Sequence, residues 1–287
     1  MRLFSMILTT PRGVSVIDVP SNSTKHSTAD TIERILWAVA ISMMLFAFCF
    51  DTPLGIVQGI WRIILHPDGL ITDYSSVGGF GATFFNAGLI MSASIIIVKL
   101  SHAMISGPTI ACIFLMAGFA MFGKNVANIW PIILGVFLFS KVNHESFSKY
   151  VYIALYATAL SPLITAVAIE SENMLQKLIV VIVFGAVIGF LTPPLATYCL
   201  RVHQGYNLYN VGFAAGLVGT LIVSVMKSFG FEITTSLVWT YENNPLVVGY
   251  MYLLSTILMV AGWWMTPHKR SLKRIYRHSG RLVADFI

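Results

Sequence analysis

The sequence has very little charge. Of its 287 residues, 10% are Asp, Glu, Lys or Arg, whereas 56% are hydrophobic. Soluble domains contain about a quarter charged residues, which cover the surface that faces water. The shortage excludes a water-soluble domain, a coiled coil, a disordered tail and a nucleic-acid-binding domain. The class that remains is an all-α polytopic membrane protein, whose apolar residues face lipid as well as the protein core.

Cysteine is also scarce. Cys49, Cys112 and Cys199 lie inside apolar runs and have neither the spacing of a disulfide framework nor a CxxC pair. A secreted disulfide scaffold is therefore excluded. The seven histidines form no HExxH motif, and no nucleophile elbow or phosphate-binding loop is present. We therefore predict no metal, no cofactor and no enzymatic activity.

Long apolar runs dominate the chain. A helix needs about 20 apolar residues to cross roughly 30 Å of hydrocarbon. Eight runs are interpreted as transmembrane helices, at residues 35–50, 77–98, 103–122, 126–140, 150–169, 178–200, 206–226 and 245–266. Two further apolar pieces, 54–65 and 233–240, are too short to cross.

The basic residues indicate the orientation. Lys and Arg cluster between residues 269 and 281, and basic residues beside spans collect on the cytoplasmic side. We predict a multi-pass cell-membrane protein with both termini in the cytoplasm: a tail over 1–33, a transmembrane domain over 34–266 and a basic segment over 267–287. The expected partners are the lipid bilayer and a small-molecule solute, with no nucleic acid, and a homo-oligomer is left open.

Several runs are short or contain proline. Pro193 and Pro194 lie in the sixth run and predict a helix break, since proline removes a backbone hydrogen bond. The piece 54–65 is a candidate re-entrant or interfacial helix, and the run 126–140 is a candidate half-span. Short and broken helices that meet near the membrane midplane form the binding sites of many transporters. The alternative is a set of ordinary proline-kinked helices.

The sequence contains two internal matches. Residues 78–89 and 205–217 are both rich in Gly and aromatic residues and both open a predicted span. Because these spans cross in opposite senses, we predict an inverted repeat. The pattern Leu-x-x-Asp-aromatic occurs at 70–74 and again at 282–286. We therefore expect one full repeat and the start of a second, as in a truncated version of a longer protein.

These motifs resemble an uncharacterised family of prokaryotic multi-pass membrane proteins. The resemblance covers the chain from about residue 35 and is carried by Leu70-Ile71-Thr72-Asp73-Tyr74, Gly78-Gly79-Phe80-Gly81-Ala82, Asn86-Ala87-Gly88 and Phe122-Gly123-Lys124-Asn125. It implies a helical membrane fold, a longer chain and no catalytic residues. More loosely, Gly205-Tyr206-Asn207 and Gly216-Leu217-Val218-Gly219 are similar to patches of urea transporters, which are channel-like proteins with inverted repeats.

Three asparagines lie in or beside predicted spans. Asn86, Asn207 and Asn210 each offer amide donors and an acceptor that suit a small polar solute. The alternative is a helix cap or an interhelical hydrogen bond, which contributes about 0.6 kcal/mol in membranes. We take all three as candidates for a solute pathway.

Two charged positions are further candidates. Lys124 and Asn125 interrupt a long apolar stretch and either present a cation and an amide to a solute or form a turn at the headgroups. Asp51 follows the first span and is either a proton or cation site or an interfacial residue, with Arg62 as a candidate partner.

Glycines at four-residue spacing complete the pattern. Gly185 and Gly189, and likewise Gly212 and Gly216, are predicted to permit close helix packing, with a pore lined by backbone carbonyls as the alternative. Together these features predict a transporter or channel for a small polar or neutral solute. A structural or signalling component without flux is the alternative, and a membrane-embedded enzyme is less favoured because no His, Asp or Glu cluster is present.

Overall fold

The computed structural model describes residues 22–68, 71–169, 173–203, 210–230, 237–242 and 244–265. Helices dominate these residues, because within a membrane the backbone groups of a spanning segment must be satisfied internally. The helices are α1 (Asn22–Ala47), α2 (Pro53–Leu65), α3 (Tyr74–Gly78), α4 (Phe80–Leu100), α5 (Gly107–Phe119), α6 (Trp130–Val142), α7 (Val151–Ala157), α8 (Ser161–Ile169), α9 (Met174–His203), α10 (Asn210–Ser228) and α11 (Pro245–Met265). The other elements are the 3-10 turns η1 (Phe147–Lys149) and η2 (Thr158–Leu160) and the strands β1 (Ile71–Thr72) and β2 (Leu237–Val238).

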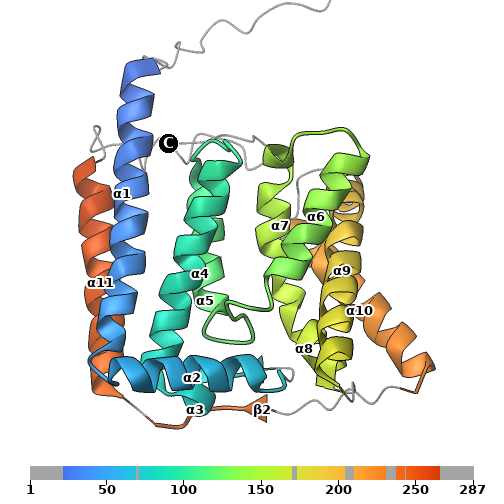
Figure 1. Ribbon diagram of the computed structural model, residues 1–287. Helices are drawn as coiled ribbons and strands as arrows, with labels where there is room; N and C mark the ends of the chain where they lie inside the picture. Colours follow the sequence, from blue (N-terminus) through green and yellow to red (C-terminus); the bar gives the residue numbers. More distant parts are fainter. Residues whose placement is uncertain are drawn as a thin grey trace, which may run out of the picture.

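Four of the described helices, α4, α9, α10 and α11, are long and apolar enough to cross a membrane. In Figure 1 α1 and α11 stand on the left, α4 and α5 in the middle, and α6 to α10 on the right. The prediction of an all-α helical membrane protein is confirmed. Which membrane it occupies, and which compartment each end faces, stay predictions.

Helices α5 and α6 form a hairpin rather than two spans. Each has 13 residues, about 20 Å at 1.5 Å per residue, which is short of a membrane crossing. In Figure 1 α5 descends, the chain turns, and α6 returns to the upper side. The interpretation of 126–140 as a half-span therefore agrees with α6, and α5 is likewise shorter than the full span predicted at 103–122. Because a hairpin replaces one pair of spans, the described start of α1 and end of α11 still lie on the same side (Figure 1).

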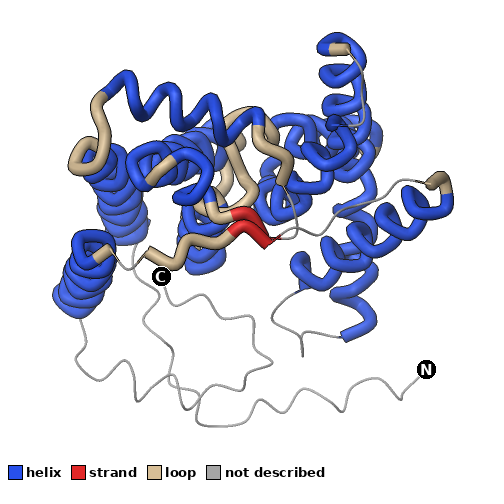
Figure 2. The backbone as a smooth tube through the Cα atoms, turned by 90° about the horizontal axis from the view of Figure 1, so that it is seen from below, coloured by secondary structure: helices blue, strands red, loops and turns tan. Residues whose placement is uncertain are grey.

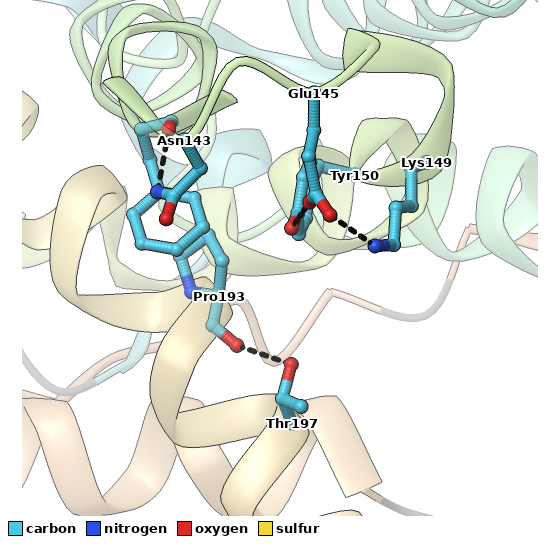
Figure 3. A network of polar contacts seen from close by, with 7 residues as sticks. Asn143, Glu145, Lys149, Tyr150, Pro193 and Thr197 are labelled. Carbon is cyan, nitrogen blue, oxygen red and sulfur yellow. Dashed lines mark hydrogen bonds and ion pairs between the residues drawn. The ribbon is translucent and has the colours of Figure 1, made fainter. Parts of the chain in front are cut away.

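The two proline-containing runs differ. The fifth predicted run is divided into α7, η2 and α8, with the 3-10 turn shortly before Pro162. By contrast, α9 continues as one helix through Pro193 and Pro194, so the predicted break there is wrong. Thr197 Oγ1 donates a hydrogen bond of 3.0 Å to the Pro193 carbonyl oxygen (Figure 3). The carbonyls that lose their amide donors to these prolines are those of Gly189 and Phe190, so the Thr197 bond accompanies the prolines and does not replace the missing bonds.

Glycines bring α6 and α9 into close contact. A Cβ atom added at Gly189 would lie 2.0 Å from the Ile132 carbonyl oxygen, and one added at Gly135 would lie 2.1 Å from the Ala186 carbonyl oxygen. At Gly185 the added atom would lie 2.4 Å from Pro131 Cβ. Any side chain at these positions would separate the two backbones, so close packing explains Gly185 and Gly189.

Helix α2 lies across the lower ends of the other helices (Figure 1). One face, which includes Ile56 and Ile63, is buried and packs on α3 and α4. The opposite face exposes Leu54, Val57, Trp61 and Leu65. An apolar helix that lies flat with one exposed apolar face is typical of a membrane interface, which agrees with the interfacial interpretation of 54–65.

A small cap covers the lower end of the hairpin. Its segments are 66–68, 71–79 and 237–240, and its two strands pair in parallel near the centre of the lower face (Figure 2). The Tyr74 amide donates to the Met121 carbonyl at 3.0 Å, and the Phe122 ring stacks on Trp239 with centroids 6.0 Å apart. These contacts join the cap to the chain that follows α5.

Candidate functional site

Buried polar residues gather where the hairpin turns. The tip loop, residues 120–129, meets the cap, α4 and the start of α8 there. We call the group the polar cluster; its members are Asp68, Tyr74, Asn86, Lys124, Asn125, Asn128, Ser161 and Thr165. Burying an unpaired polar group is costly. The hydrogen bonds of each member of the cluster therefore indicate which of them serve the fold.

The tip loop holds its own shape. Gly123 has a φ of +82°, a backbone conformation that favours glycine, and a Cβ there would lie 2.7 Å from Pro162 Cγ. The Asn125 side-chain oxygen accepts from the Asn128 amide, and the Asn128 side-chain oxygen accepts from the Asn125 amide, at 3.0 and 2.9 Å. Asn128 Nδ2 also donates to the Gly123 carbonyl at 3.0 Å. These bonds end α5 and redirect the chain into α6.

Asn86 attaches the tip loop to α4. It is fully buried, and its Nδ2 donates to the carbonyl oxygens of Ala120 and Lys124, both at 2.8 Å. Its Oδ1 accepts from the Val126 amide at 3.2 Å. Because both amide protons and the oxygen are engaged, the geometry supports the interhelical structural role of Asn86 rather than contact with a solute.

Lys124 is buried without an acidic partner in the described part of the chain. Its side chain is 2% exposed. The ammonium group lies 3.2 Å from Met116 Sδ and 4.9 Å from the centroid of the Phe119 ring. A thioether is a weak acceptor and a ring stabilises a cation only modestly. The structure therefore leaves most of the hydrogen-bonding capacity of this ammonium unused.

Asp68 is the buried carboxylate of the cluster. Its Oδ2 accepts from Thr165 Oγ1 at 2.8 Å, from the Tyr74 hydroxyl at 3.3 Å and from Asn128 Nδ2 at 3.5 Å. Burial raises the pKa of the Asp68 carboxyl to about 7, although the hydrogen bonds from Thr165 and Tyr74 act in the opposite direction. Asp68 lies between α2 and β1, outside the spanning helices.

Three buried polar atoms in this region have no hydrogen-bond partner among the described residues. They are Asp68 Oδ1, Ser161 Oγ and His66 Nδ1. Ser161 lies one turn before Thr165 on α8, so both belong to the helix that faces the tip loop. Buried polar groups are nearly always paired, so these three atoms distinguish this region from the rest of the described chain.

Other predicted site residues lie elsewhere. Asp51 precedes α2, at the opposite end of that helix from Asp68, and its carboxylate is packed beside Gly79 and Gly81 at the start of α4. A negative charge at a helix N-terminus is stabilising, which explains Asp51 structurally. Within the described residues it forms no ion pair with Arg62.

The structure gives little information on the solute-pathway and packing residues predicted near the start of α10. Asn207 lies outside the described residues, and Asn210 is the first residue of α10, with a side chain that is not described. Gly212 is exposed, and no atom outside the helix backbone lies within 4 Å of a Cβ added at Gly216. Within the described chain, therefore, this pair does not pack against a neighbouring helix. The second half of the repeat hypothesis, at 205–217, rests on these residues and stays a prediction.

Sequence reasoning missed Asp68, Asn128 and Thr165 as members of the site. Asp68 is a single acidic residue just after the short apolar piece 54–65, and Thr165 lies inside an apolar run. The sequence does contain one indication of the turn. Two asparagines three residues apart, Asn125 and Asn128, favour side-chain bonds to the backbone and so predict a capped turn rather than a continuing span.

One described cavity lies beside the cluster rather than within it. It has a volume of about 850 Å³ and is largely apolar, with walls from the upper end of α4, from α6 and from α9. Ala127 and Trp130 connect its lining to the tip loop. The polar cluster itself is closed in this structure, since Asp68, Lys124 and Asn125 are all at least nine-tenths buried.

Comparison with known families identifies the group to which the protein belongs. A family model described as a protein of unknown function, DUF1576, matches residues 52–228. The chain belongs to this family. The match runs from the start of α2 to the end of α10 and includes the whole polar cluster. No curated protein and no solved structure matches this DUF1576 chain.

The match confirms the resemblance to an uncharacterised family and assigns no activity. A prokaryotic origin and a similarity to urea transporters stay predictions.

Proposed function

We propose that the protein moves a small polar solute across the membrane and binds it at the polar cluster. The observation that supports this most directly is Lys124, a buried ammonium whose described contacts are the Met116 thioether and the Phe119 ring, with the Cys112 thiol nearby and no acidic partner among the described residues. A charge inside a membrane protein without a paired counter-charge is a functional site by default. A solute with an acceptor oxygen would supply the missing hydrogen bonds.

The helix geometry supports the same proposal. The hairpin brings the end of α5 and the start of α6 together at the cluster, and the α7–η2–α8 interruption adds a third irregular segment. Thr158 of that interruption donates to Met116 Sδ, the same sulfur that Lys124 contacts, at 3.3 Å. Transporters commonly build substrate sites where discontinuous helices meet.

The test is a flux assay with purified protein in proteoliposomes, using a panel of small carboxylates, amides, amino acids and inorganic anions. Wild type is compared with Lys124→Met, whose unbranched apolar side chain suits the Met116 and Phe119 surroundings. Lys141→Met is the matched control, because Lys141 is exposed and lies in the last turn of α6. We expect Lys124→Met to lose the flux that wild type and Lys141→Met retain.

Two results would contradict the proposal. One is the absence of flux for every solute with folded wild-type protein, which would favour a structural or signalling component. The other is equal flux in wild type and Lys124→Met, which would place any pathway away from the polar cluster.

A further inference from the structure

We propose that Asp68 binds a proton during each transport cycle and so couples solute movement to proton movement. The inference rests on the proposed function and names the coupling ion of the same polar cluster. Nothing in the family assignment refers to this residue.

The two carboxylate oxygens of Asp68 have different surroundings. Oδ2 faces donors from Thr165, Tyr74 and Asn128. Oδ1 is buried and has no hydrogen-bond partner among the described residues, and the whole residue is 4% exposed. An ionised carboxylate places negative charge on both oxygens, so Oδ1 holds charge where no donor stabilises it. Protonation removes this charge.

Thr165 is placed to accommodate both protonation states. Its Oγ1 lies 2.8 Å from Asp68 Oδ2 and 3.0 Å from the Pro162 carbonyl oxygen. When Asp68 is ionised, the hydroxyl donates to the carboxylate. When Asp68 is protonated on Oδ2, the carboxyl donates to Thr165, whose own proton turns to the Pro162 carbonyl. A hydroxyl rotates freely enough to make this exchange.

The surroundings favour a proton over a metal cation. Three donors point their hydrogens at Oδ2, which leaves one oxygen of Asp68 for a cation, whereas hard cations bind several oxygens. Among the described residues, the titratable and charged groups on the elements packed against Asp68 are Arg62 and His66 at the end of α2, Asp73 and Tyr74 of the cap, and Lys124 of the tip loop. Tyr74 contacts Asp68, while Lys124 is directed to Met116 and Asp73 accepts from Ser75 and Thr240.

The pKa of Asp68, raised to about 7 by burial, gives a signal that does not require a known solute. Because the folded-state pKa lies above the ordinary value, the folded protein binds this proton more tightly than the unfolded chain does. The contribution is present at low pH and is lost as the pH rises through about 7.

The first measurement is the melting temperature of the purified protein in detergent between about pH 5 and pH 8. We expect the wild-type melting temperature to fall across this range and that of Asp68→Asn to be nearly constant. Glu33→Gln is the control, because Glu33 forms an ion pair with an exposed Lys99 far along the chain, and it should follow the wild type. Equal pH dependence in wild type and Asp68→Asn would overturn the assignment.

The second measurement is solute uptake into proteoliposomes that contain a pH-sensitive dye. An imposed proton gradient should accelerate wild-type uptake, with matching acidification, by a factor of about five or more. Asp68→Asn should abolish the acceleration, measured as the ratio of uptake with the gradient to uptake without it, so that a changed basal rate does not affect the comparison. If a solute moves but Asp68→Asn keeps the wild-type response, the proton site is wrong and the proposed function stands. If no solute moves with folded protein, the proposed function itself fails.

Replacing sodium by choline separates the two coupling ions. Uptake that depends on sodium and not on the proton gradient would overturn the proton assignment.

Discussion

Helices α4 and α11 look alike in sequence but occupy opposite environments. Both have 21 residues and both are apolar enough to cross a membrane. In its most apolar stretch, 72% of the α4 residues are buried, whereas none of those of α11 are. α4 packs against α1, α2, α3 and α5, while α11 stands beside α1 at the edge of the molecule (Figure 1).

The difference lies in side-chain size and polarity rather than in overall hydropathy. α4 carries small residues, which let neighbouring helices approach, and the buried amide of Asn86. α11 carries Trp, Tyr, Met and Leu side chains. Four of its residues, Val247, Tyr250, Leu254 and Leu258, pack on the core, and Tyr250 also stacks on Phe46 and lies 2.8 Å from the Ser42 hydroxyl. Small residues on an apolar helix indicate protein neighbours, and bulky ones are compatible with lipid.

The largest effect should come from adding volume to α4. A Cβ at Gly88 would lie 2.5 Å from Met44 Cγ and 2.8 Å from the Ala40 carbonyl oxygen, so Gly88→Leu must separate α1 from α4. We expect a loss of about 3 kcal/mol or more, or no folded protein. The matched variant is Gly249→Leu in α11. No described atom outside the backbone of α11 lies within 4 Å of a Cβ added at Gly249, so stability should hardly change. Size-exclusion profiles after heating measure how much folded protein each variant retains. Equal retention in Gly88→Leu and Gly249→Leu would contradict the difference between α4 and α11.

A smaller loss is expected when Asn86 is replaced by Leu. The substitution leaves the Ala120 and Lys124 carbonyls and the Val126 amide without their partner inside the protein. We expect a cost of about 1–3 kcal/mol. Asn143→Leu is the control, because Asn143 is exposed and bonds only its own helix at the Phe139 carbonyl (Figure 3). Thermal unfolding in detergent compares the two variants. An unchanged melting temperature in Asn86→Leu would show that Asn86 does not hold the tip loop to α4.

Lys124→Met should change stability in the opposite direction. Removing a buried ammonium that has no acidic partner in the described part of the chain eliminates its desolvation cost, while the new side chain keeps the contacts with Met116 and Phe119. We expect a gain of about 1 kcal/mol or more, measured as a higher melting temperature. A lower melting temperature would show that Lys124 serves the fold rather than a solute.

The smallest effect should come from Tyr250→Phe in α11. The variant removes the hydrogen bond between Tyr250 and Ser42 but keeps the ring on Phe46. Such bonds contribute about 0.6 kcal/mol in membrane proteins, so the melting temperature should barely move. A loss as large as that of Asn86→Leu would show that α11 is held to the bundle as firmly as α4.

The described ion pairs contribute little to stability. Lys99 of α4 pairs with Glu33 of α1 at 2.7 Å, and the Lys99 side chain is 67% exposed. Figure 3 shows Glu145 contacting Lys149, at 2.6 Å, and Tyr150 beyond the end of α6. The Lys149 side chain is 61% exposed, and exposed pairs of this kind are weak. They mark the edge of the apolar region rather than stabilise its interior.

Parts of the candidate site were readable from residue types. Lys124 and Asn125 stand out because a cation and an amide interrupt an apolar stretch, and the close packing at Gly185 and Gly189 follows from their spacing. Residue type alone does not fix the role of Asn86, because an amide in a span can form an interhelical hydrogen bond or contact a solute. Its three hydrogen-bond partners, all in the tip loop, show that Asn86 joins the loop to α4.

The sequence alone determined that this is a helical membrane protein, because scarce charge and long apolar runs admit no other fold class. Tertiary structure decided which apolar runs span. The α5 and α6 runs turn back because Gly123, Asn125 and Asn128 close a capped loop that Asn86 holds to α4. It also brought Asp68 to Thr165 across 97 positions of the chain. Hydropathy is a local property of a segment, whereas the partner of a buried polar group is set by packing between distant segments.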